Sequence, residues 1–150
     1  MAVTEERALT AAAEALLKGE AFGALHLDMT EKEVVAVLGP PSKKGKAAEE
    51  GATGEWIATW EWAKAGVEAV VTDAKKKPVV RSLELRAACG FKTRRGVGIG
   101  STPAEVDAAY HAVRGSSNEH MYRVGGPYYG MVFEFKAGKV ASIFWGPLGE

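Results

Sequence analysis

Apolar residues recur along the chain with two periods, one typical of helices and one typical of strands. Residues 5–18 place apolar side chains at i, i+3, i+4 and i+7, which predicts an amphipathic helix that Gly19 ends. Two shorter helices are expected after Thr30 and after Thr102, because each begins a Thr-x-x-Glu sequence typical of a capping box. Gly39, followed by two prolines, ends the first of these.

Alternation with period two predicts strands in the rest of the chain. They are expected at 55–63, 67–72 and 79–86, and again at 119–124, 128–136 and 140–146. The polar, Gly-containing residues 42–54 predict a mobile loop. The same period places Trp56, Trp60 and Trp62 on one side of their strand, so we expect most aromatic side chains in a core beneath the helices.

The two halves repeat the same features in the same order, which indicates a duplicated unit. Thr30-x-x-Glu-Val matches Thr102-x-x-Glu-Val, Gly66-Val67 matches Gly130-Met131, and Ser82-Leu83 matches Ser142-Ile143. We therefore predict an α+β protein of two tandem helix-plus-antiparallel-sheet repeats, with the helices on one face. Residues 1–88 would hold the N-terminal helix and the first repeat, and residues 89–150 the second, around a shared core.

Charge and cysteine content exclude several classes of function. Lys plus Arg and Asp plus Glu both number 19, and this balance argues against a dedicated nucleic-acid binder and against adhesion to anionic lipid. Cys89 is the single cysteine, so it closes no disulfide within the chain. No apolar run approaches the ~20 residues that span a bilayer, and charges interrupt the start. We expect a cytoplasmic protein as the chain stands, or a periplasmic or exported one if a signal peptide was removed.

Catalytic and metal-binding patterns are missing from the sequence. His26, His111 and His120 lack the spacing of a metal set, and there is no Gly-x-Ser-x-Gly nucleophile elbow. The Gly-rich residues 96–102 precede a helix, but they lack the Lys of a Walker motif. We therefore expect no enzyme, no cofactor and no metal. A small-ligand carrier or an enzyme that uses this Gly cluster is the alternative from another class.

The order of turn, Thr-x-x-Glu-Val helix, Leu-Gly-x-Pro and strands rich in Trp and Tyr resembles a known repeat. That known repeat occurs in the β-lactamase inhibitor protein and in the small outer-membrane lipoprotein of the barrel-assembly machinery. The residues that carry the resemblance are Met29-Thr30, Glu33-Val34 and Leu38-Gly39-Pro40, with Gly100-Ser101-Thr102 and Glu105-Val106 in the second half. The resemblance covers most of residues 20–147. It implies a non-enzymatic protein that binds another protein with one face of its sheet.

The outward side chains of the strands are the candidate binding residues. Their carboxylates could meet a basic partner and steer its approach, although a plain solvated face is the alternative. Tyr128 and Tyr129 are expected on a loop, where a large ring could anchor a partner. The predicted protein-binding residues are Glu61, Glu68, Glu84, Arg86, Arg123, Tyr128, Tyr129, Glu134 and Phe144. An inhibitor or immunity-type protein is the sharpest form of this hypothesis, and an envelope assembly or scaffold factor is the alternative.

Overall fold

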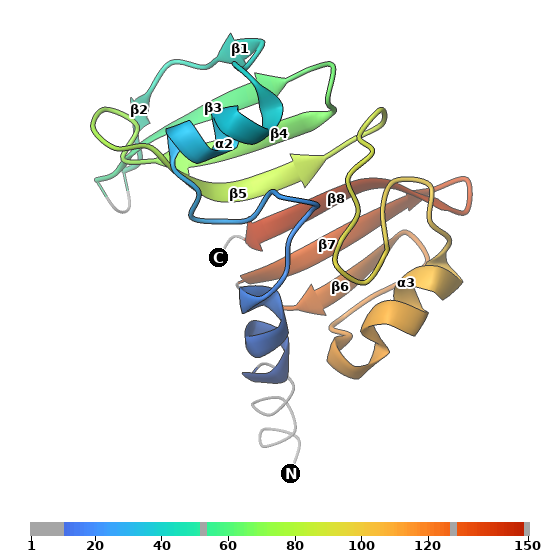
Figure 1. Ribbon diagram of the computed structural model, residues 1–150. Coiled ribbons are helices and arrows are strands. Elements are labelled where there is room, and N and C mark those ends of the chain that lie inside the picture. Colours follow the sequence, from blue (N-terminus) through green and yellow to red (C-terminus); the bar gives the residue numbers. More distant parts are fainter. Residues whose placement is uncertain (1–10, 52–53, 127–128, 149–150) are drawn as a thin grey trace.

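The computed structural model describes residues 11–51, 54–126 and 129–148. These residues form helices and one eight-stranded antiparallel sheet, so the predicted α+β class is confirmed (Figure 1). Residues 11–18 are helical, α2 spans Glu31–Leu38, and α3 spans Pro103–Tyr110 and continues into the 3-10 helix His111–Val113. Residues 5–10 of the predicted first helix lie outside the described residues. Within the described part, no helix is long and apolar enough to cross a membrane.

Both predicted capping boxes are present, and they explain where α2 and α3 begin. The Thr30 hydroxyl accepts a hydrogen bond from the Glu33 amide at 3.2 Å, and the Glu33 carboxylate accepts one from the Thr30 amide at 2.9 Å. Thr102 and Glu105 make the same pair of bonds at the same distances. Each box satisfies two amide groups that the first turn of a helix would otherwise leave unpaired.

The six long strands lie close to their predicted positions. They are β3 Trp56–Trp62, β4 Val67–Thr72, β5 Val79–Leu85, β6 Met121–Gly125, β7 Tyr129–Lys136 and β8 Lys139–Pro147. Their order across the sheet is β3-β4-β5-β8-β7-β6, so the two halves join at β5 and β8, where Glu84 lies opposite Phe144. One sheet therefore runs through both halves.

The prediction of a strandless loop at 42–54 is wrong. Two short strands, β1 Lys43–Lys44 and β2 Ala48–Glu49, pair with β3 along its outer edge. Their side chains are exposed on both sides, so no alternation of polar and apolar residues marks them in the sequence. Their pairing covers an edge that would otherwise expose free backbone groups.

Corresponding turns and bulges occur in the two halves. The segment before α2 is fixed to β5, where the Asp28 amide donates to the Val80 carbonyl at 2.8 Å. The segment before α3 is fixed to β8, where the Gly100 amide donates to the Val140 carbonyl at 2.8 Å. The pairing of β4 with β5 shifts register after Val70, and the pairing of β7 with β8 shifts after Glu134.

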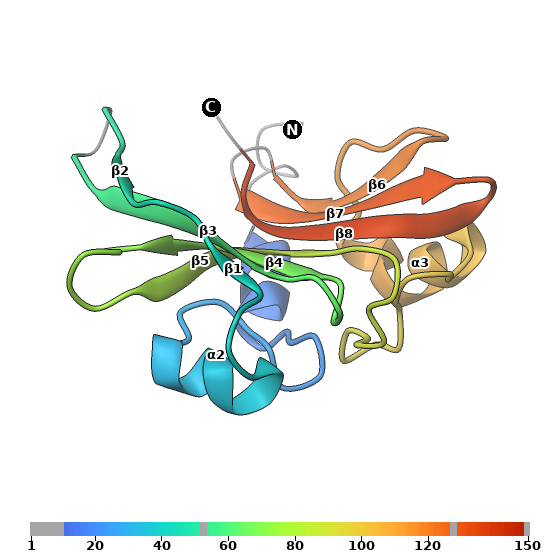
Figure 2. The same cartoon turned by 90° about the horizontal axis from the view of Figure 1, so that it is seen from above.

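The core lies between the sheet and the helices. Figure 2 shows α2 and α3 on the same side of the sheet, which we call the helix face. Leu17, Val34, Val106 and Tyr110 from the helices are buried. They meet buried side chains of the strands, among them Trp60, Trp62, Leu83, Met131, Phe133 and Trp145. The opposite side, which we call the open face, is crossed by none of the described helices.

A buried carboxylate links three parts of the helix face. Glu20, directly after the N-terminal helix, is 4% exposed. One of its oxygens accepts from the amides of Ala21 at 3.0 Å and Arg94 at 2.7 Å, and the other accepts from the Tyr110 hydroxyl at 2.8 Å. Both carboxylate oxygens of Glu20 thus accept hydrogen bonds, and these bonds permit the carboxylate to be buried without a cation.

Candidate binding surface on the open face

Strand pairing places six side chains in one line across the open face, and we call this line the transverse row. Five of them are predicted binding residues, and Val132 is the sixth. In the antiparallel register each member lies directly opposite the next. From the β3 side to the β6 side the row consists of Glu61, Glu68, Glu84, Phe144, Val132 and Arg123. With strands about 4.8 Å apart, the row is roughly 24 Å long.

Three carboxylates lie side by side in the first half of this row. Glu61 is opposite Glu68, and Glu68 is opposite Glu84. All three residues are half-buried. Directly opposed side chains have Cβ atoms about 5 Å apart, and like charges in such pairs destabilise a sheet. This arrangement therefore costs stability unless a cation balances it.

Arg86 balances part of this charge. It follows the last residue of β5, and its Nε lies 2.7 Å from a Glu84 oxygen while a terminal nitrogen lies 3.3 Å from a Glu68 oxygen. The hydrogen bond that Arg86 donates to Glu84, and the charges of Glu84 and Glu68, raise the pKa of Arg86. Glu61 makes no ion pair with any residue that the structure describes. One guanidinium thus contacts two of the three carboxylates, and Glu61 lies opposite Lys43 of β1.

The second half of the row is apolar and ends in a cation. Phe144 and Val132 are half-buried and adjacent. Arg123 follows on β6, and its Nε is buried without a hydrogen-bond partner in the described part of the chain. The row is therefore negative at one end, apolar in the middle and positive at the other end.

The remaining predicted residues are divided between the two faces. Glu134 lies on the open face, two residues along β7 from Val132 of the row, and is exposed. Tyr129 does not lie on a loop as predicted: it is the first residue of β7 and shares the helix face with Met131 and Phe133. Its position at a strand end, with glycines before it in the sequence, looked like a turn. Tyr128 lies outside the described residues.

Sequence reasoning left one member of the row, Val132, and one neighbour of it, Lys43, out of the candidate site. Val132 is its central apolar residue, and Lys43 of β1 lies opposite Glu61 at its acidic end. Period two already placed Val132 outward, but its place beside Phe144 depends on β7 pairing with β8 in this register. Lys43 lies in the segment that was predicted to have no strand.

Other candidate chemistry is not assembled in the described residues. They contain no group of three or more His, Cys, Asp or Glu side chains that could hold a metal ion. His26, His111 and His120 are exposed. Cys89 is buried, and burial raises the pKa of its thiol, which disfavours the reactive thiolate.

Comparisons with family models, with curated protein sequences and with solved structures give no significant match for this chain.

Proposed function

We propose that the protein is a non-enzymatic interaction module that binds a cationic segment of another protein on its open face. The observation that carries this proposal is the run of three opposed carboxylates, of which one arginine contacts only two. A sheet gains nothing in stability from such a run, because opposite like charges repel. A function that uses the negative charge accounts for its presence.

Arg86 indicates how a partner would engage the row. Its guanidinium contacts Glu84 and Glu68 at once, and both carboxylate side chains are less exposed than the arginine that covers them. A Lys or Arg side chain of a partner could approach Glu61 in the same way. The negative end of the row would also raise the rate of encounter with such a partner.

The polarity of the row favours one orientation of the partner. Phe144 and Val132 offer an apolar surface next to the acids, and Arg123 supplies positive charge beyond it. A complementary segment would therefore present a cation, then an apolar side chain, then an acid. An extended segment about seven residues long covers the roughly 24 Å of the row.

We also propose that the fold arose by duplication of a unit made of one capped helix and three strands. The two capping boxes, the two backbone attachments before the helices and the two register shifts support this proposal. The strand order β3-β4-β5 followed by β8-β7-β6 is also symmetric about the β5–β8 junction. The resemblance favours an inhibitor or immunity-type protein, and an envelope assembly or scaffold factor is the alternative.

The direct test measures binding to the full chain of a labelled seven-residue peptide, Lys-Thr-Lys-Thr-Val-Thr-Glu, whose alternate side chains present cations, then an apolar residue, then an acid. The double variant Glu61→Gln/Glu68→Gln should lower its affinity about tenfold, since two charge pairs are lost. The matched control Glu14→Gln/Glu119→Gln removes the same charge from exposed positions outside the row. Equal weakening by both double variants would mean that only net charge matters, and the proposal would then fail.

The partner can be sought with the same surface. Capture from the source lysate should be lost when Glu68 and Glu134 are both changed to Lys, because the face would then repel a cationic segment. An inhibitor would retain one tight partner, whereas an assembly factor would retain several envelope proteins. Unchanged capture by the double variant would remove the open face as the binding surface.

A further inference from the structure

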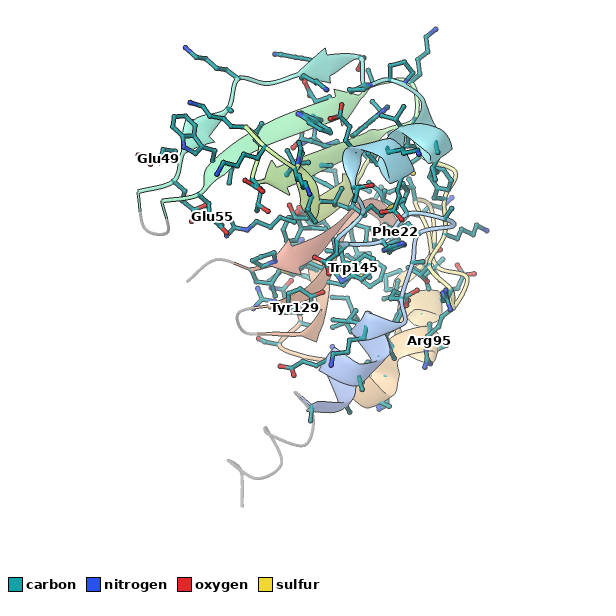
Figure 3. All side chains as sticks on the ribbon, turned by 60° about the vertical axis from the view of Figure 1, so that its left-hand side comes forward. Phe22, Glu49, Glu55, Arg95, Tyr129 and Trp145 are labelled. Carbon is teal, nitrogen blue, oxygen red and sulfur yellow. The ribbon has the colours of Figure 1, made fainter. Side chains whose placement is uncertain are left out.

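The two faces of β8 differ in what covers them. On the helix face, the Trp145 ring is 2% exposed and packs edge-on against Phe22, with ring centroids 5.5 Å apart (Figure 3). The preceding residue, Phe144, lies on the open face, where it is half-buried and directly opposite Val132 of β7. None of the described helices crosses this face (Figure 2). Phe144 and Val132, which we call the apolar pair, therefore have no covering helix in the described part of the chain.

The transverse row carries opposite charges on the two sides of the apolar pair. Glu84 lies on the β5 side, and Arg123 lies on the β6 side. Arg123 is half-buried and makes no ion pair with any residue that the structure describes. Arg86 contacts both Glu84 and Glu68, so a single positive charge faces two negative charges there. An unmatched cation and a surplus of negative charge thus flank the apolar pair.

These four members of the row form a pattern that is complementary to itself. Read from β5 to β6, Glu84, Phe144, Val132 and Arg123 present an acid, two apolar side chains and a cation. Read from β6 to β5, they present a cation, two apolar side chains and an acid, which is the order expected of a partner of this face. A second copy turned so that its row runs in the opposite direction would therefore match the first.

One symmetry operation produces this match. A two-fold axis between two facing sheets, directed along the strands and passing between β7 and β8, reverses the row of the second copy. Glu84 of each copy would then lie opposite Arg123 of the other, and Phe144 opposite Val132. The adjacent pair of Glu134 with Ser142 fits the same axis, because the Ser142 hydroxyl of one copy could donate to the Glu134 carboxylate of the other.

We propose that a second copy of this chain binds to the open face over β5, β8, β7 and β6, in a symmetric dimer. Two Glu84–Arg123 ion pairs would surround a centre made by the two apolar pairs. This inference rests on the proposed function only in taking the open face as a binding surface, and it names one partner of that face. Glu61 and Glu68 lie on β3 and β4, outside the four facing strands, so the dimer leaves them open to a cationic segment.

The area of the contact sets the expected strength of the dimer. Four strands that lie about 4.8 Å apart and are about 20 Å long offer roughly 400 Å² per copy, or about 800 Å² in total. Stable interfaces bury more than about 1,200 Å². The dimer should therefore be weak, and the proportion of dimer should rise with protein concentration.

The test measures the mass of the full chain by sedimentation equilibrium, at protein concentrations from about 10 μM to about 1 mM. The parent should pass from monomer to dimer within this range. Glu84→Arg and Arg123→Glu should each weaken dimerisation by about tenfold or more, because each variant brings two pairs of like charges together. The matched changes Glu14→Arg and Lys32→Glu, at exposed helix positions, should have no effect.

Mixing the two row variants tests the symmetry itself. An equimolar mixture of Glu84→Arg chains and Arg123→Glu chains should dimerise about as well as the parent, although each variant alone stays monomeric. In the mixed dimer one ion pair keeps its original charges and the other has them exchanged. Far-UV circular dichroism checks that both variants are folded. If Arg123→Glu does not fold, the comparison of Glu84→Arg with Glu14→Arg decides.

Three results would overturn the proposal: a parent that stays monomeric at about 1 mM, a Glu84→Arg chain that dimerises like the parent, or a mixture of folded variants that stays monomeric. The proposed function fails or stands separately. Glu61→Gln/Glu68→Gln, the variant that should lose the cationic peptide, should keep its dimerisation within about twofold of the parent, because neither residue lies in the dimer contact.

Discussion

Glu20 on the helix face and Glu68 on the open face are both carboxylates in the body of one small protein, but their neighbours differ. Glu20 is 4% exposed and accepts three hydrogen bonds from two backbone amides and a tyrosine. Glu68 lies between two other carboxylates and shares one arginine with Glu84. The first arrangement stabilises the fold, whereas the second leaves a repulsion that the shared arginine offsets only in part.

The contrast between Glu20 and Glu68 distinguishes structural from functional charge on a sheet. A carboxylate whose partners are all supplied by the chain is part of the scaffold. A carboxylate that lies opposite two other carboxylates, on a face that the described helices leave open, and that shares one arginine with one of them is only partly neutralised by the chain. Removing charge should therefore have opposite effects on stability in the two places, and each prediction below measures that contrast.

The largest effect is expected at Glu20. Glu20→Ala leaves the amides of Ala21 and Arg94 and the Tyr110 hydroxyl without their acceptor inside the fold, which should lower the free energy of unfolding by about 3 kcal/mol. Glu20→Gln keeps one carbonyl oxygen and should cost about 1 kcal/mol. Urea denaturation measures both. Equal losses in the two variants would mean that packing, and not hydrogen bonding, is what Glu20 contributes.

A smaller loss is expected when one bond to a carboxylate is removed. Tyr110→Phe should lower the free energy of unfolding by about 1.5 kcal/mol, because the buried Glu20 oxygen loses its hydroxyl donor. The matched change Tyr122→Phe removes a 2.7 Å hydrogen bond to Asp107, a partly exposed carboxylate that water can still reach. It should cost about 0.5 kcal/mol. The comparison fails if Tyr122→Phe is the more destabilising of the two.

On the open face the sign should reverse. Glu68→Gln removes repulsion from Glu61 and Glu84 and also the 3.3 Å ion pair with the exposed Arg86; because an exposed pair contributes little, the change should raise the free energy of unfolding by about 0.5 kcal/mol. Arg86→Ala removes the shared cation and should lower it by a similar amount. Thermal unfolding at low and at moderate salt checks both, since screening should shrink the two effects together. A destabilising Glu68→Gln would show that Glu68 belongs to the scaffold like Glu20.

The sequence predicted those parts of the fold whose causes are local. Each capping box joins residues only three positions apart, Thr30 with Glu33 and Thr102 with Glu105, so both boxes can be recognised in the sequence. Period two gave the long strands and the outward carboxylates. The helix face was foreseen in the same way, because one side of each strand is apolar.

What the sequence did not reveal depends on contacts between distant residues. In the sequence Glu20 resembles an ordinary polar residue at the end of a helix. In the structure it accepts hydrogen bonds from the Arg94 amide, 74 residues along the chain, and from the Tyr110 hydroxyl, 90 residues along. The transverse row needs the pairing of Glu84 with Phe144, which no turn connects. Tyr129 was assigned to a loop because the glycines before it resemble a turn, although it is the first residue of β7.

The smallest effect concerns the caps, whose carboxylates are bound by amides as Glu20 is but lie in solvent. Hydrogen bonds from the Thr30 amide and hydroxyl lower the pKa of Glu33, and those from Thr102 lower the pKa of Glu105. A carboxyl whose pKa is lower in the folded state stabilises the fold above its unfolded pKa, about 4.3, and this contribution is lost as pH falls through the folded pKa. Carbon-detected NMR titration should place the pKa of both groups below the ordinary value for a glutamate, about 4.3. Glu33→Gln should lower stability at neutral pH and converge with the parent in acid; a gap that stays constant down to acid would show that the cap does not act through the charge of its carboxylate.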